Sequence, residues 1–360
     1  MRKTLLLAAA LIAPLFTAPA PLAAQASAAQ AAGKTKPSPL APSEIVAAAP
    51  NANWTRIAPA DLLVMELASD AKGKPRRVVI QLMPPPFSAG WIGNIRKLAA
   101  AHWWDGMSIN RVQDNYVVQW GDPNADDKAK AKVLPTGLAT MPESDYQINP
   151  IDELGRTAAL ASATTETRKM WSAYKKQCHF SAASKPPYIC NISGVRSKHG
   201  KRSYASAEAF SKGWPIATDH TYTWPIHCYG MVGVGRDLSP NTGSGAELYV
   251  VIGHAPRHLD RNIALVGRVI EGIEFLSSLP RGHGGLGFYD LEQGDERVPI
   301  QSIHPGVEVS GLPAYEYLST ESASFANYAD ARANRRDAFF IRPAGGADIC
   351  NIPVPVRRVK

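Results

Sequence analysis

Residues Ile109 to Pro123 read INRVQDNYVVQWGDP, and no other stretch of the sequence is as informative. Its apolar residues alternate with polar ones, as expected for a pair of half-buried strands. Arg111 and Gln119 lie an even number of residues apart, which places them on one face. The stretch holds no obvious nucleophile, metal cluster or phosphate loop. A lone arginine on a strand is usually solvated, so its context must decide whether it belongs to a site.

The composition is that of a globular chain with a substantial core. The 360 residues are 45% hydrophobic and carry a formal charge of +8, and their number allows one large domain or two ordinary ones. The basic residues are scattered, with short clusters at 128–132, 196–202 and 335–336. A nucleic-acid-binding surface would gather them on one face among aromatic residues. We therefore expect solvated surfaces and no nucleic-acid partner.

The N-terminus has the layout of a secretory signal peptide. A basic start precedes an apolar core from Leu5 to Phe16, and small residues follow in A-x-A spacing. That core is too short to span a bilayer, and no later segment is long and apolar enough. We expect a signal peptide over 1–28, a flexible linker rich in Ala and Pro over 29–53, and an ordered protein that begins near Trp54. The sequence thus predicts a periplasmic or secreted protein without membrane insertion.

Because disulfides persist in the compartments to which proteins are exported, the four cysteines are expected to form disulfides. Cys178, Cys190, Cys228 and Cys350 form an even set, which allows three pairings. Cys178 with Cys190 is favoured because their short separation closes easily, which leaves Cys228 to tie the C-terminal tail at Cys350. A zinc site is the weaker interpretation, because the sequence holds no C-x-x-C pair. We expect structural disulfides and no metal.

Most of the remaining pattern predicts strands. They are expected in 62–67, 76–83, 109–123, 227–237, 245–253, 263–270 and 297–305. Helical spacing occurs in 87–104, with Ser88 as N-cap, and in 271–279 and 321–337. Residues 145–225 differ in character, with a helical pattern in 152–177 and a polar, irregular stretch in 191–210. The pattern suggests a closed antiparallel β architecture interrupted by one long insertion.

Four segments in order resemble the cyclophilin family of peptidyl-prolyl cis-trans isomerases. They are GNIRKLA (93–99), GMSINRVQDNYVVQWGDP (106–123), GMVGVGRDLSPNTGSGAELYVVIG (230–253) and LDRNIALVGRVIEGIEFL (259–276). The resemblance covers about 54–144 and 226–304. It implies a mainly β fold, an eight-stranded antiparallel barrel capped by two helices. A cyclophilin-like domain over 54–310 would then contain the insertion 145–225 and be followed by an extension over 311–360.

The chemistry that the resemblance implies requires no nucleophile and no cofactor. Rotation about an X–Pro bond is blocked by amide resonance, with a barrier of about 18–20 kcal/mol. A catalyst must hold the proline ring and stabilise the twisted amide, for which an always-charged donor on a rigid strand is suited. By resemblance Arg111 is the catalytic arginine and Gln119 the positioning residue. The substrate-binding residues carried over in the same way are Tyr116, Val117, Arg236, Glu247, Tyr249, His258 and Leu259.

Several positions depart from the family pattern. Glu247 stands where the family has glutamine, and His258 stands where many members have tryptophan, so we expect poor cyclosporin binding. Asn110 replaces the histidine before the arginine, and the histidine of the proline pocket falls at Ile263. Taken alone, the apolar residues of this set are as readily core as pocket lining.

We expect an exported, monomeric prolyl isomerase that acts on proline-containing unfolded or newly exported polypeptides. The alternative is a periplasmic chaperone or peptide-binding module that keeps the barrel with little or no catalysis. The departures from the family pattern motivate this alternative.

Overall fold

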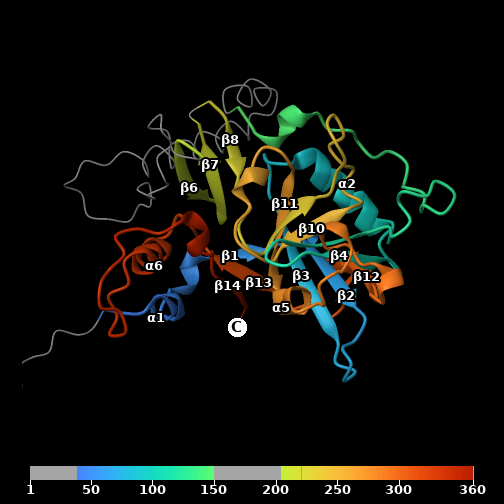
Figure 1. Ribbon diagram of the computed structural model, residues 1–360. Coiled ribbons are helices and arrows are strands. Elements are labelled where there is room, and N and C mark those ends of the chain that lie inside the picture. The colour runs from blue at the N-terminus through green and yellow to red at the C-terminus, as the bar shows by residue number, and fades with distance from the viewer. Residues whose placement is uncertain (1–38, 150–203, 220, 360) are drawn as a thin grey trace, which may run out of the picture. The chain divides into compact units, whose positions relative to one another are not determined.

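The computed structural model describes residues 39–149, 204–219 and 221–359, and its largest element is a closed antiparallel barrel (Figure 1). Around the barrel the strands follow the order β10 (Leu248–Val251), β5 (Val117–Gly121), β4 (Ser108–Val112), β12 (Val298–Pro305), β2 (Leu62–Leu67), β3 (Arg76–Leu82), β11 (Leu265–Glu271) and β9 (Met231–Val234). The expected eight-stranded antiparallel barrel is confirmed.

Two helices pack on the barrel, as expected. Helix α2 (Ala89–Ala100) lies against β12 and α5 (Ile273–Ser277) against β3. The apolar face predicted for α2 is buried. Ser88 occupies the N-cap position but does not cap: its φ is 51°, in the left-handed region, and its side chain accepts no hydrogen bond there. The cap expected from residue type therefore fails because of backbone conformation.

The ordered chain begins before the expected start near Trp54. Helix α1 (Pro42–Ala47) lies within the stretch expected to be a linker and packs against α6 (Ala323–Ala333), as Figure 1 shows. The C-terminal segment adds β13 (Tyr315–Leu318) and β14 (Val356–Arg358), which form a three-stranded sheet with β1 (Trp54–Ile57) in the order β1-β13-β14. The extension is thus paired with the first strand.

The described part of the insertion is a second three-stranded sheet. Strands β6 (Ala207–Ser211), β7 (Trp214–Thr218) and β8 (Thr223–Pro225) pair in sequence order. This corrects the expectation of an irregular stretch up to residue 210. Because nearly every residue of β6 and β7 is buried, these strands lack the alternation that marks a half-exposed strand. The helix expected in 152–177 and the Cys178–Cys190 bridge lie outside the described residues.

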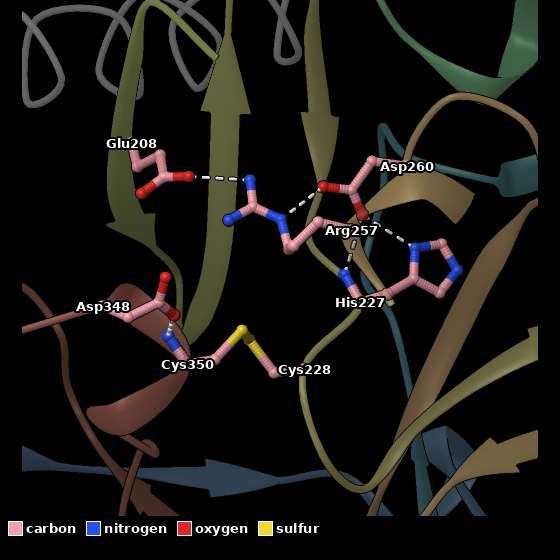
Figure 2. The surroundings of a disulfide bond; sticks show 7 residues. All are labelled: Glu208, His227, Cys228, Arg257, Asp260, Asp348 and Cys350. Atoms are coloured by element: carbon pink, nitrogen blue, oxygen red, sulfur yellow. Dashed lines mark hydrogen bonds and ion pairs between the residues drawn. A yellow bond between two sulfur atoms is a disulfide. The ribbon is translucent and has the colours of Figure 1, made fainter. Parts of the chain in front are cut away.

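A disulfide joins Cys228 to Cys350, with 5.1 Å between the Cα atoms and 122 residues of sequence separation (Figure 2). The pairing predicted for these two cysteines is confirmed. No helix in the described ranges combines the length and apolar character needed to cross a membrane.

Candidate active site

Arg111 and Gln119 face each other across the β4–β5 pair. They are direct partners in the antiparallel register, and a bulge lies between Ile109 and Arg111. Arg111 Nη1 donates to Gln119 Oε1 at 3.3 Å. The two side chains therefore share a face because they are cross-strand neighbours, whereas the sequence argument used their even offset along the chain.

The guanidinium of Arg111 is held by neutral groups. Its Nε donates to the carbonyl of Leu286 at 2.7 Å, and Nη2 donates to Gln113 Oε1. Its Cζ lies 5.6 Å from the ring centroid of Tyr116 and 5.3 Å from that of Phe288. Burial lowers the pKa of Arg111, and Tyr116 opposes this, but the group stays charged at neutral pH. Among the described residues it forms no ion pair, so its charge is available to a ligand.

An apolar cluster lies beside this pair. Val117, Tyr249 and Val251 are its buried members, and Tyr116, Leu259 and Ile263 pack against them. Tyr249 on β10 is the register partner of Gln119, which links the cluster to the polar pair. The structure thus brings together Tyr116, Val117, Tyr249 and Leu259, which the resemblance placed in the proline pocket. Ile263, at the position of the family's pocket histidine, lies in the same cluster, and the structure adds Val251.

Glu247, which precedes β10, lies next to Gln119. Gln119 Nε2 donates to Glu247 Oε2 at 3.4 Å. A Cβ on Gly121 would overlap this carboxylate, and a Cβ on Gly235 would lie 2.9 Å from Glu247 Cβ, so both glycines make room for the side chain. Burial raises the pKa of Glu247 to about 7, with the charge of Asp122 acting in the same direction and the hydrogen bond from Gln119 opposing them. The residue therefore titrates close to neutral pH.

Arg236 and His258 lie at the edges of this arrangement. Arg236 donates to the backbone carbonyls of Asn262 at 3.0 Å and Asp237 at 2.6 Å, and no ion pair with Glu247 is found among the described residues. His258 is exposed, and its ring stacks on that of Tyr116 with centroids 6.2 Å apart. The structure places His258 beside the apolar cluster and gives Arg236 a backbone-bracing role.

The family model described as cyclophilin type peptidyl-prolyl cis-trans isomerase/CLD matches residues 91–304, which is more than half of the chain and includes the whole arrangement. The chain belongs to the cyclophilin family. Among solved structures, cyclophilin AquaCyp293 from Hirschia baltica has a TM-score of 0.54 and 17% identity, over 85% of this chain and 94% of that chain. At this identity the likeness shows the fold.

Two other solved structures are more distant. A cyclophilin-type peptidyl-prolyl cis-trans isomerase of Cryptosporidium parvum has a TM-score of 0.33 and 11% identity, over 68% of this chain and 96% of that chain. Its structure in the presence of the dipeptide Ala-Pro gives 0.32 and 10%, over 67% and 98%. None of the curated proteins matches this cyclophilin.

Sequence reasoning missed the segment that covers Arg111 in this cyclophilin. Leu286 and Phe288 lie more than 170 residues from Arg111 along the chain, yet one accepts its Nε hydrogen bond and the other lies over its guanidinium. Both are exposed large apolar residues in a glycine-rich segment. That exposure is known only from the structure, so the sequence offered no signal that pointed from these residues to Arg111.

One group of metal-ligand side chains lies elsewhere in the described structure. His102, His304 and Glu308 each bring a ligand atom within 4.8 Å of the others. The two imidazoles are stacked, with centroids 3.9 Å apart and planes 20° from parallel. Imidazole lone pairs lie in the ring plane, so those of stacked rings run side by side and do not converge on one ion. We therefore assign no metal to this cyclophilin from that cluster.

Proposed function

We propose that the chain is an active peptidyl-prolyl cis-trans isomerase whose catalytic residue is Arg111. The observation that carries the proposal is a charged guanidinium that has no acidic partner in the described part of the chain and lies beside the apolar cluster. Arginine has five N–H donors, and three take part in the contacts to Leu286, Gln113 and Gln119. The remaining donors would serve the substrate.

The proposed reaction breaks no bond. The proline ring binds against Tyr116, Val117, Tyr249 and Leu259, and Gln119 positions the substrate backbone. Arg111 donates a hydrogen bond to the imide nitrogen as the amide twists and its conjugation is lost. That nitrogen gains basicity only in the twisted state, so the interaction stabilises the transition state more than either planar form.

The decisive experiment is an isomerisation assay on a short X-Pro peptide. We expect the wild type to accelerate cis-trans exchange and Arg111→Ala to lower kcat/KM by about 100- to 1000-fold, as for the loss of one preorganised donor. The matched control is Arg77→Ala, which removes a partly exposed arginine paired with Glu66 on the barrel and should leave kcat/KM within about twofold. A wild type no faster than buffer refutes the enzymatic proposal, and full activity in Arg111→Ala refutes the site.

A second candidate function is peptide binding without efficient catalysis. It is favoured by the segment of Leu286 and Phe288, which already contacts the guanidinium of Arg111. The discriminating measurement compares isomerisation with suppression of aggregation of an unfolded client protein. Suppression by a wild type that does not accelerate isomerisation supports this candidate.

Export is part of the proposal. The pattern in residues 1–28 supports a cleaved signal peptide, and the substrates would then be proline-containing segments of exported proteins. Mass spectrometry of the mature protein from its native host tests this, with cleavage expected near residue 28. Sedimentation at several concentrations tests the proposed monomeric state.

A further inference from the structure

A continuous chain of buried polar side chains runs from the inserted sheet to the apolar cluster. We call Glu208, Arg257, Asp260, His227 and Tyr249 the buried polar chain. Arg257 Nη2 lies 2.7 Å from Glu208 Oε1 as an ion pair, and Arg257 Nε donates to Asp260 Oδ2 at 2.7 Å (Figure 2). His227 Nδ1 lies 2.9 Å from Asp260 Oδ1, and His227 Nε2 lies 3.0 Å from Tyr249 Oη. All five residues are buried.

The buried polar chain gives Tyr249 a fixed position. An ionised carboxylate only accepts hydrogen bonds, so the N–H of His227 Nδ1 donates a hydrogen bond to Asp260 Oδ1. The other ring nitrogen, Nε2, makes the hydrogen bond with the hydroxyl of Tyr249. On β9 a Cβ at Gly233 would overlap the Tyr249 ring, so the ring is closely packed there. The hydroxyl contact and this packing hold the aromatic wall of the apolar cluster in one orientation.

The buried polar chain also anchors the turn that carries Leu259, on the other side of the apolar cluster. Arg257 and Asp260 flank His258 and Leu259, within and directly after the 3-10 turn Arg257–Leu259. Burial alone would raise the pKa of Asp260, but the hydrogen bonds and charges of His227 and Arg257 outweigh it, so the pKa lies below its usual value. Asp260 is therefore ionised at neutral pH, and the turn that carries Leu259 is held at both ends.

The end of the buried polar chain that is farthest from Tyr249 belongs to elements outside the barrel. Glu208 lies on β6 of the inserted sheet. Cys228 follows His227 and is bridged to Cys350 of the C-terminal extension, as Figure 2 shows. Both additional elements are thus attached to the segment that orients Tyr249.

We propose that the buried polar chain positions Tyr249 and Leu259 against the proline ring, so that the inserted sheet sets how tightly the site holds proline. This inference rests on the proposed isomerase function and adds positioning residues to it. Glu208, Arg257, Asp260 and His227 act through Tyr249 and Leu259. The inserted sheet is then part of the binding apparatus as well as a support for the barrel.

The test compares two buried carboxylates that differ in their connection to the site. In Glu208→Gln the ion pair with Arg257 is lost, and we expect KM for a short X-Pro peptide to rise about tenfold, with kcat within about twofold. Glu316→Gln is the matched control, because Glu316 is equally buried and ion-paired to Arg357 at 2.6 Å in the sheet β1-β13-β14. It should leave KM unchanged, although both variants should lower thermal stability.

A double-mutant cycle separates positioning from a general loss of stability. Tyr249→Phe removes only the hydroxyl at the other end of the chain and should raise KM to a similar extent. The double variant with Glu208→Gln should show little further rise, because both substitutions interrupt one chain. Fully additive effects, or equal KM changes in Glu208→Gln and Glu316→Gln, overturn the inference while leaving the isomerase proposal intact.

Peptide affinity, measured by NMR titration of the same X-Pro peptide, distinguishes the two failures. A wild type that binds the peptide without isomerising it refutes the proposed activity, and the affinities of the same variants then test the positioning role. A wild type that binds no proline peptide overturns both.

Discussion

Replacing Glu247 by glutamine should stabilise this cyclophilin at alkaline pH and leave it unchanged in acid. Burial is the main reason that the pKa of Glu247 lies at about 7 instead of its ordinary 4.5. The folded protein therefore binds this proton more tightly than the unfolded chain does. Each tenfold difference in proton affinity corresponds to about 1.4 kcal/mol, so the difference between the two pKa values amounts to about 3 kcal/mol.

The sign follows from the direction of the shift. The contribution of Glu247 to stability is fully present below pH 4.5 and is lost as the pH rises through about 7, where the half-buried carboxyl ionises. A glutamine is neutral at every pH and resembles the protonated acid in shape. Glu247→Gln should therefore match the wild type near pH 4.5 and exceed its free energy of unfolding by about 3 kcal/mol at pH 8.

Urea unfolding of wild type and variant at pH 4.5, 6 and 8 measures this difference. Glu316→Gln is the control with the opposite expectation, because its carboxylate is ion-paired to Arg357 and its loss should destabilise at pH 8. A difference between wild type and Glu247→Gln that stays constant over this pH range would show that the carboxyl is not held in a desolvated state.

Three further substitutions test other parts of the structure. Cys350→Ser opens a disulfide with 122 residues of sequence separation, and urea unfolding should show a loss of up to about 5 kcal/mol from chain entropy. Gly233→Ala forces the Tyr249 ring to move, so calorimetry should show weaker binding of a proline peptide together with about 1–3 kcal/mol lower stability. Gln81→Leu removes the acceptor of two hydrogen bonds, at 2.8 and 3.0 Å, from the buried Arg268, and denaturant titration should show a loss of about 3 kcal/mol. An unchanged unfolding midpoint in Cys350→Ser or Gln81→Leu, or unchanged peptide binding and stability in Gly233→Ala, contradicts the corresponding contact.

The barrel strands could be predicted because their signal is local. A half-buried strand repeats every two residues, and turn-forming residues separate one strand from the next. The same reasoning failed for β6 and β7, since both faces of these strands are covered and their residues show no alternation. It also failed for Ser88, where residue type suggested a cap that a left-handed backbone does not allow.

Within the candidate site, Arg111 and Gln119 were assigned through the resemblance, and their even offset suggested a shared face. The cross-strand register that makes them neighbours comes from the structure. The apolar residues around them could be named only through the resemblance, since a valine or tyrosine on a strand looks the same in a core and in a site. Phe288 could not be found by either route. It reaches Arg111 only once the chain between them has folded around the barrel.

The sequence by itself determined the barrel, the polar pair Arg111 and Gln119, and the cysteine that ties the C-terminal tail. The strands depend on short-range periodicity and the cysteines on residue chemistry, whereas the polar pair was assigned through the resemblance to the cyclophilin family. Only the tertiary structure decided that Glu208 connects through three buried side chains to Tyr249. Such a chain needs exact registration of β6, the 3-10 turn and β10, which lie far apart in sequence. Because these groups are buried, the loss of any one partner would leave an uncompensated polar group and lower the free energy of unfolding. The packing of the whole domain therefore selects these contacts, and no local pattern specifies them.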